Sequence, residues 1–222
     1  MHAAFVDALF NLTAGRFVRA RRAAELAITM EESLEVHRAK TAHSQRVRSM
    51  AHMVAAESAH ALQDRTRREA HFQSMLELAP SREGQEGREG ALLRAARWAV
   101  DDRDASKALE WLDQMPSGVA RRTVALRLRL RAARLAGRSQ QALDAVRQLI
   151  KHRAFSEVAG AGMARGLALE MLRSAHDPSQ LQRAWDGLDA AEQKVPDVAL
   201  EAAERCLQLG GEASSSRQWL LP

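Results

Sequence analysis

The sequence predicts an all-α protein built from helical hairpins that recur along the chain. Its composition is that of a helical protein, because Ala, Leu, Arg and Glu are strong helix formers and only 5 prolines and 12 glycines interrupt the 222 residues. Apolar residues recur at spacings of three and four, which is the period of an amphipathic helix. One hairpin is too small to bury its apolar faces alone, so several copies are expected to stack side by side.

Residues 119–155 form the clearest hairpin. Its helices are predicted over 120–136 and 139–151. Gly137 lies between them, where a left-handed residue without a Cβ can end the first helix, and Ser139 is expected to cap the second. Each helix carries an apolar stripe at i, i+4 and i+7: Leu126, Leu130 and Ala133 in the first, and Ala142, Val146 and Leu149 in the second.

The run LRLRLR, at residues 126–131, alternates leucine with arginine and so also fits a half-buried strand. It lies within about 17 residues of strong helix formers, with no turn signal on either side. The helix is therefore favoured over the strand.

Residues 3–28 form the first pair, in which Gly15 ends the first helix. The second helix carries a bulky residue and three small ones at spacings of three, four and three: Phe17, Ala20, Ala24 and Ala27. Small residues let the two helices approach closely, and the bulky residue fills the gap beside them. This pattern resembles the second half of the tetratricopeptide repeat (TPR). The resemblance implies a right-handed superhelical array of TPR-like antiparallel helix pairs, with the first helices lining a concave face.

About five and a half pairs are expected, over residues 3–28, 45–79, 88–115, 120–152, 157–194 and an incomplete 197–220. Asp104 is placed to cap a second helix, and Pro178 fits the first turn of another. The polar stretch 29–48 is expected either to extend a helix or to bridge two pairs, and the glycine-rich stretch 81–90 to be a loop. The whole chain, residues 1–222, is expected to be a single repeat domain and a fragment of a longer, membrane-anchored protein.

Several side chains are predicted to lie in the core. Cys206 lies in an apolar helical stretch and is expected to be a small core residue. Trp98 and Trp111 are expected to pack between helices, with a groove anchor for a peptide as the alternative, and Trp185 and Trp219 lie on predicted helices. Six methionines on apolar faces are predicted core residues: Met50, Met53, Met75, Met115, Met163 and Met171.

Composition excludes several classes of protein. One cysteine excludes an internal disulfide and a cysteine-based zinc cluster. No apolar run reaches the 18 or so residues of a membrane span, and polar residues interrupt the first twenty residues, unlike a signal peptide. The chain is therefore expected to be soluble. A net charge of +5 permits an acidic partner without indicating nucleic acid.

Arginines form the candidate binding site. Four of them lie at i, i+4, i+7 and i+11 and predict a basic ridge: Arg127, Arg131, Arg134 and Arg138. Arg94 and Arg97 lie in a neighbouring first helix. If these helices line a concave wall, the guanidiniums can bind carboxylates of acidic peptides or of porphyrin propionates, because the planar fork pairs bidentately with a carboxylate. The alternative is a solvated face paired with Glu and Asp of adjacent helices.

No residue pattern predicts catalysis or a metal site. The eight histidines are scattered, and none forms an i, i+4 pair; axial ligation of haem by one of them is an open alternative to ordinary surface positions. Adjacent carboxylates such as Asp101 and Asp102 point to different faces of a helix. No nucleophile elbow, Walker loop or carboxylate–histidine arrangement is present.

Three longer segments resemble one family: ALLRAARWAVDDRDASKALEWLDQMPSGVARRTVALRLRLRAARLAG (91–137), KHRAFS (151–156) and AWDGLDAAEQKVPDVALEAAERCLQLG (184–210). They are similar to the TPR region of the proteobacterial HemY-type proteins. The resemblance implies a role at a late step of protohaem synthesis at the inner membrane, with two transmembrane helices upstream and the TPR region on the cytoplasmic side. A flavin-dependent protoporphyrinogen oxidase shares that name, but the sequence has no GxGxxG after a strand, which excludes this identity.

Together these features predict a non-enzymatic scaffold for protein–protein interaction. The resemblance implies that its partners are enzymes of haem biosynthesis, with no cofactor, no nucleic acid, and membrane contact only through segments absent from this chain. The alternative is a porphyrin or haem carrier that uses an arginine-lined concave groove. The incomplete last pair is expected to expose an apolar face, which predicts a homodimer.

Overall fold

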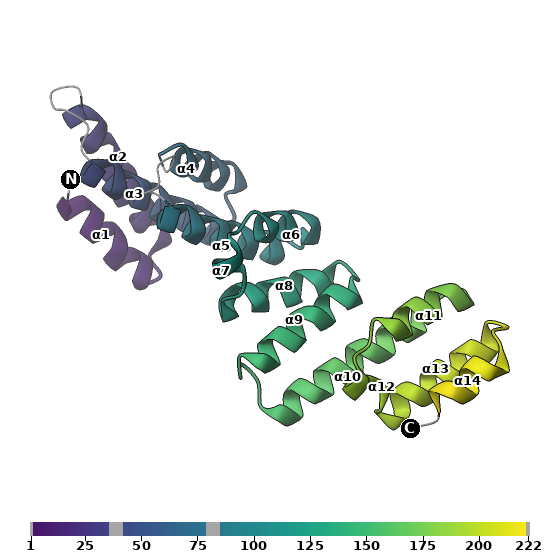
Figure 1. The fold of residues 1–222 in the computed structure, drawn as a ribbon. Helices are drawn as coiled ribbons and strands as arrows, with labels where there is room; N and C mark the ends of the chain where they lie inside the picture. The colour runs from purple at the N-terminus through teal and green to yellow at the C-terminus, as the bar shows by residue number, and fades with distance from the viewer. Residues whose placement is uncertain (1, 36–41, 79–84, 221–222) are drawn as a thin grey trace. The chain divides into compact units, whose positions relative to one another are not determined.

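The computed structural model describes residues 2–35, 42–78 and 85–220, and all regular secondary structure within them is helical (Figure 1). The all-α prediction is therefore confirmed. The chain packs as two compact units, Met1–Trp98 and Ala99–Pro222. In the described ranges, no helix is both long enough and apolar enough to cross a membrane.

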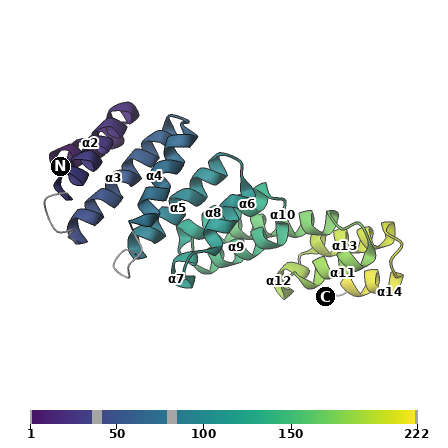
Figure 2. The same ribbon diagram turned by 90° about the horizontal axis from the view of Figure 1, so that it is seen from above.

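The first unit consists of helical hairpins. Its helices are α1 (His2–Thr13), α2 (Phe17–Glu35), α3 (Ala42–Ala61), α4 (Arg65–Glu77) and most of α5 (Gln85–Asp101). Helix α1 packs on α2, α2 on α3 and α3 on α4, so that α2, α3 and α4 lie side by side (Figure 2). Within the polar stretch 29–48, α2 continues to Glu35 and α3 begins at Ala42. The residues between these helices, where a bridge was the alternative expectation, lie outside the described residues.

Small residues allow this close packing, as the repeat pattern predicts. Ala20 and Ala24 are fully buried, and Ala24 lies in one cluster with Ala8 of α1 and Ala55 of α3. Gly15 ends the first hairpin turn with a positive φ of 69°, the left-handed conformation expected there.

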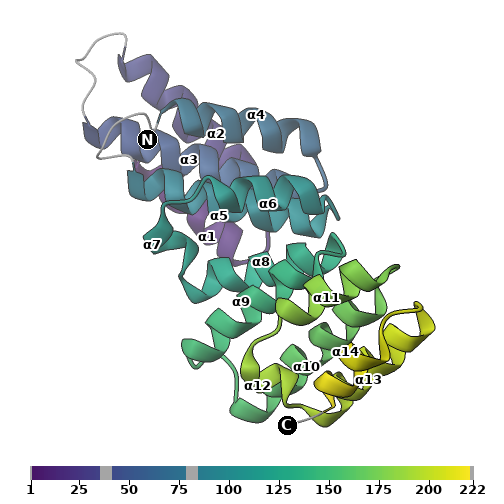
Figure 3. The ribbon, with the colours of Figure 1, turned by 45° about the vertical axis from the view of Figure 1, so that its right-hand side comes forward.

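The second unit contains nine helices among its described residues. They are α6 (Ala105–Asp113), α7 (Ser117–Ala120), α8 (Thr123–Leu135), α9 (Ser139–Lys151), α10 (Glu157–Arg173), α11 (Pro178–Asp186), α12 (Ala190–Gln193), α13 (Pro196–Gln208) and α14 (Ala213–Trp219). Helix α9 packs between α8 and α10, and α13 contacts α10, α11, α12 and α14 (Figure 3). A continuous apolar core joins α8 to α14, in which Leu143, Leu172 and Leu181 are fully buried and Cys206 is buried as predicted.

Residues 126–131 are helical, as the surrounding helix formers predict. The three leucines of this run are buried on α8, while Arg127 and Arg131 are exposed. Gly137 adopts a φ of 66° and ends the hairpin turn, Asp104 caps α6 by accepting a hydrogen bond from the Lys107 amide, and Pro178 occupies the first turn of α11. These three terminus predictions are confirmed.

The expected cap of α9 is wrong. Ser139 is the first residue of the helix, and its Oγ donates to Glu170 Oε1 of α10 at 3.0 Å. The capping position belongs to Arg138, whose side chain makes no capping hydrogen bond. Because a carboxylate from the next helix reaches Ser139, a tertiary contact replaces the local one that the sequence suggested.

Two long helices predicted from the sequence are interrupted. The helix expected over 120–136 begins only at Thr123, because Arg122 is extended, with a ψ of 142°, and the one-turn helix α7 precedes it. The helix expected over 178–194 is divided into α11 and α12 at residues 187–189. Asp189 and Glu192 form a capping box that begins α12 anew.

Two further expectations are wrong. Of the loop expected over residues 81–90, residues 85–90 belong to α5, whose first turns tolerate Gly87 and Gly90. Residues 81–84 lie outside the described residues. Met50 is 54% exposed on α3 and is not a core residue, whereas Met75, Met115 and Met171 are buried.

Two glycines of the second unit are expected to respond to alanine with opposite signs. Gly137→Ala is expected to destabilise the unit by about 1 kcal/mol, because alanine is strained at positive φ although no atom lies within 4 Å of the added Cβ. Gly162→Ala on α10 is expected to stabilise by about 0.5–1 kcal/mol, because the helical glycine also has open space around it. Urea unfolding followed by circular dichroism measures both. Equal effects at the two positions would contradict the backbone explanation.

Candidate functional site

Arg94 and Arg97, two of the six predicted binding arginines, are engaged within the first unit. Arg94 Nη1 donates to Glu57 Oε2 of α3 at 3.0 Å, and Arg97 Nη2 donates to Glu57 Oε1. The indole Nε1 of Trp98, which is buried as predicted, donates to the same carboxylate at 3.2 Å. Burial would raise the pKa of Glu57, but the two guanidiniums outweigh it and lower the pKa below its ordinary value. Here the alternative from the sequence holds: these arginines are paired with an acid of an adjacent helix.

The other four predicted arginines lie on α8 or directly after it, in the second unit. All four are exposed: Arg127, Arg131, Arg134 and Arg138. Arg131 approaches Asp101 at 3.7 Å, and Arg127 Nη2 donates to the Ala154 carbonyl oxygen at 3.3 Å. The side chains of Arg134 and Arg138 make no ion pair with any described residue. The six arginines thus belong to two compact units, and only the α8 set keeps guanidiniums available for a ligand.

A cleft at the end of the second unit was not predicted. It has a volume of about 920 Å³ and is lined by residues of α11, α12, α13 and α14 and their connections. The rings of Trp185 and Trp219 stack beside it, with centroids 5.1 Å apart and planes inclined by 27°. We call it the Trp cleft; its lining is Gln182, Trp185, Asp186, Ala190, Gln193, Lys194, Pro196, Ala199, Leu200, Gln218, Trp219 and Leu220. The sequence placed both tryptophans on helices, but their stacking joins residues that are far apart in the chain.

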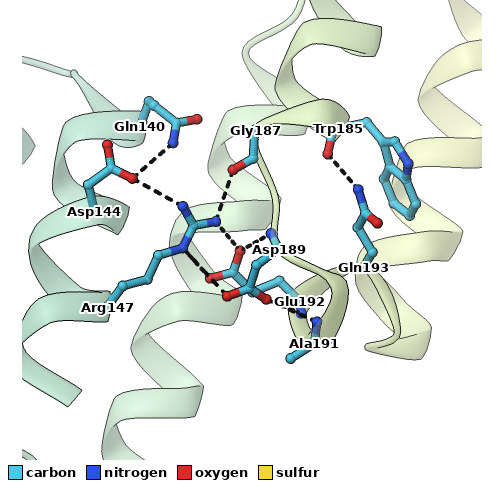
Figure 4. Close-up of polar contacts among 9 residues, drawn as sticks. All are labelled: Gln140, Asp144, Arg147, Trp185, Gly187, Asp189, Ala191, Glu192 and Gln193. Carbon is cyan, nitrogen blue, oxygen red and sulfur yellow. Dashed lines mark hydrogen bonds and ion pairs between the residues drawn. The ribbon is translucent and has the colours of Figure 1, made fainter. Parts of the chain in front are cut away.

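One wall of the Trp cleft is held in place by Arg147 of α9 (Figure 4). Its guanidinium donates to both carboxylate oxygens of Glu192, from Nε at 3.1 Å and from Nη2, and Nη2 also donates to the Gly187 carbonyl oxygen at 2.9 Å. Nη1 donates to Asp144 Oδ1 of the same helix at 3.1 Å. Hydrogen bonding to Glu192 raises the pKa of Arg147 above its ordinary value, so that the side chain stays charged. Arg147 therefore fastens the bend between α11 and α12 to α9.

The same bend positions Trp185. Glu192 is buried, and its Oε2 accepts from the Asp189 amide at 2.9 Å, while Asp189 Oδ1 accepts from the Ala191 and Glu192 amides. Gln193 Nε2 donates to the Trp185 carbonyl oxygen at 3.0 Å (Figure 4). The network thus continues from α9 through α12 to the last turn of α11, where the indole lies.

The chemistry of the Trp cleft suits an uncharged or weakly charged segment of a protein. Apolar and polar side chains line it together, and the lining residues Leu200 and Leu220 are 49% and 51% exposed. The glutamine side chains of the lining can both donate to and accept from a polypeptide backbone. Asp186 and Lys194 carry opposite charges, so the lining has no dominant sign.

The first unit contains a buried histidine pair. Nδ1 of His52 on α3 and Nδ1 of His71 on α4 are 3.1 Å apart, and His52 is only 6% exposed. Burial, then the neighbouring His71 and Arg48, lower the pKa of His52 to about 4. No sequence signal pointed to this pair, because 19 residues separate the two histidines. Among the described residues, no group of three or more His, Cys, Asp or Glu side chains could hold a metal ion.

Comparisons with protein-family models, with curated proteins and with solved structures gave no match.

Proposed function

We propose that this protein is a non-enzymatic helical-repeat scaffold that binds a partner protein in the Trp cleft. The observation that supports it is a cleft of about 920 Å³ whose lining includes two stacked indoles and two exposed leucines. Aromatic side chains in apolar depressions are the usual anchors of protein interfaces. The volume lies at the upper end of the range typical of binding sites.

The partner segment is expected to be short, extended and largely uncharged. An apolar side chain of such a segment can contact Leu200 and Leu220, and its backbone can bond with the carboxamides of Gln182, Gln193 and Gln218. A strongly charged segment is disfavoured, because Asp186 and Lys194 offset each other.

The resemblance to the HemY-type proteins suggests where such a scaffold acts. By this resemblance, the partners would be enzymes of late haem biosynthesis at the inner membrane. The scaffold would hold these enzymes near each other. A second candidate, porphyrin or haem carriage, is favoured by the exposed guanidiniums of α8, since tetrapyrrole propionates are carboxylates.

Two leucines of α13 provide a matched test of the Trp cleft. Leu200 lines the cleft, whereas Leu207, 59% exposed on the same helix, does not. Peptides selected from a displayed random library on the native protein are expected to bind Leu207→Glu unchanged. They are expected to bind Leu200→Glu at least about tenfold more weakly, because a charge buried without a partner opposes binding by 1.4 kcal/mol or more. Tryptophan fluorescence and polarisation of labelled peptides measure the two affinities.

The outcomes separate the two candidate functions. Selected peptides that bind both leucine variants equally would remove the Trp cleft as the docking site. Protoporphyrin titrated into the native protein distinguishes carriage: a saturable Soret shift that Arg127→Ala plus Arg131→Ala abolishes would favour the carrier over the scaffold. No shift, together with peptide binding that depends on Leu200, is the result expected here.

A further inference from the structure

We propose that the exposed arginines Arg127, Arg131 and Arg134 of α8, together with Arg138 directly after the helix, form a docking surface for an acidic, extended segment of a partner protein. We call this surface the α8 ridge; it consists of Arg127, Arg131, Arg134 and Arg138. None of these residues lines the Trp cleft, so the α8 ridge is a second contact surface whose test does not depend on the first.

The spacing of the α8 ridge matches that of an extended peptide. Intervals of four and three residues place Arg127, Arg131 and Arg134 on one face of α8, at steps of about 6 and 4.5 Å along its axis. Arg138 follows the end of the helix, directly after Gly137. Every second residue of an extended chain lies about 6.6 Å further along on the same side. A segment with acidic residues at alternate positions can therefore present successive carboxylates to successive arginines.

Four other arginines of this unit have acidic partners on other helices. These pairs are Arg129 with Asp113, Arg147 with Glu192, Arg165 with Asp197 and Arg173 with Glu201. On the α8 ridge, Arg131 alone meets an acid among the described residues, and that contact with Asp101 is long and exposed, with 60% of the arginine side chain accessible. An exposed ion pair of this kind contributes little to the stability of the fold.

Helix α8 itself contains no Asp or Glu. Within the helix, Arg127, Arg131 and Arg134 each have a like charge three or four residues away, and such pairs destabilise a helix by about 0.2–0.5 kcal/mol each. A bound anionic segment would convert this repulsion into charge-assisted hydrogen bonds, which are strongest for the arginine fork and a carboxylate. A local arrangement that works against folding is expected at a binding surface.

The composition of the α8 ridge favours a protein segment over nucleic acid. Single-stranded nucleic acids bind to basic surfaces that also offer aromatic rings for stacking, and the ridge contains none. Its exposed apolar neighbours on α8 are Val124 and Leu135, 60% and 39% exposed, which suit aliphatic side chains between the acids of a peptide.

A labelled peptide in which glutamate alternates with serine tests the α8 ridge directly. It is expected to bind the native protein with an affinity that falls as salt rises, because the contacts are exposed ion pairs. Arg134→Glu plus Arg138→Glu is expected to weaken binding by at least about tenfold. Arg134→Lys plus Arg138→Lys is expected to give an intermediate affinity, since the charge remains and the fork is lost.

The matched control is Lys107→Glu plus Lys151→Glu, which changes the net charge by the same amount at exposed positions outside the α8 ridge. It is expected to bind the peptide nearly as the native protein does, and circular dichroism checks that each variant is folded. Equal losses in the two glutamate variants would show attraction to net charge only and overturn the proposal. So would tighter binding of oligothymidylate or of phosphatidylserine vesicles than of the peptide, with the same dependence on Arg134 and Arg138.

Discussion

Arg147→Ala is expected to lower the free energy of unfolding of the unit Ala99–Pro222 by about 3 kcal/mol. Among the described residues, the Arg147 guanidinium is the only positively charged group that pairs with the Glu192 carboxylate. The Glu192 side chain is only 9% exposed. Removing the arginine leaves a buried carboxylate unpaired and the Gly187 carbonyl oxygen without its donor. The bend between α11 and α12 would then lose its attachment to α9.

Hydrogen–deuterium exchange and urea unfolding measure this effect. Amides of α11 and α12 are expected to exchange faster in Arg147→Ala, and peptide binding in the Trp cleft to weaken with them, because Gln193 and Trp185 lie on the same bend. Arg173→Ala is the control, since this arginine also pairs across helices, with Glu201, but its side chain is 61% exposed. Comparable losses of unfolding free energy in the two variants would contradict the prediction, because the burial of Glu192 would then not account for the effect of Arg147→Ala.

Acidification is expected to destabilise the first unit before its carboxylates titrate. His52 and His71 both have pKa values lowered by burial, and the pKa of His52 is about 4. The folded protein keeps these rings neutral, whereas the unfolded chain binds protons near pH 6.5, so stability is complete above pH 6.5 and falls as pH drops toward 4. The expected loss across this window is roughly 2 kcal/mol, less than the full linkage value because the pair is partly solvated.

The geometry gives the reason for this loss. With Nδ1 atoms 3.1 Å apart, one ring donates to the other only while at least one Nδ1 is unprotonated, and two charged rings would repel each other. Glu25 lies 3.6 Å from His71 Nε2 and opposes the lowering of the His71 pKa, without reversing it. Unfolding followed at several pH values should show the slope, and His52→Gln should flatten it. His152→Gln, which alters an exposed ring of the other unit, should leave it unchanged; an identical slope in His52→Gln would contradict the prediction.

Helix positions were largely predictable because their signals are local. The left-handed glycine at 137, the aspartate cap at 104 and the proline at 178 act within one turn of the chain, and each lies where expected. The alternating run at 126–131 was correctly assigned to a helix, because the strong helix formers on either side of it outweigh its strand-like alternation. The error at Ser139 arises because a distant residue, Glu170, competes with the local signal. The break between α11 and α12, by contrast, has a local signal that was missed, the capping box of Asp189 and Glu192.

The candidate sites were less predictable, because their residues come together from separate helices. Residue spacing placed Arg94 and Arg97 in a groove, but Glu57, about forty residues earlier, pairs with both. The stacking of Trp185 on Trp219 and the pairing of Arg147 with Glu192 likewise join positions that share no sequence pattern.

Periodicity, caps and glycines were sufficient to establish an all-helical chain of hairpins and an unusually basic helix, since these properties depend on neighbours along the backbone. Which arginines are neutralised, where a cleft opens and which histidines face each other depended on how the helices pack. The physical reason is that burial and pairing arise between surfaces, and a linear spacing does not specify which surfaces meet.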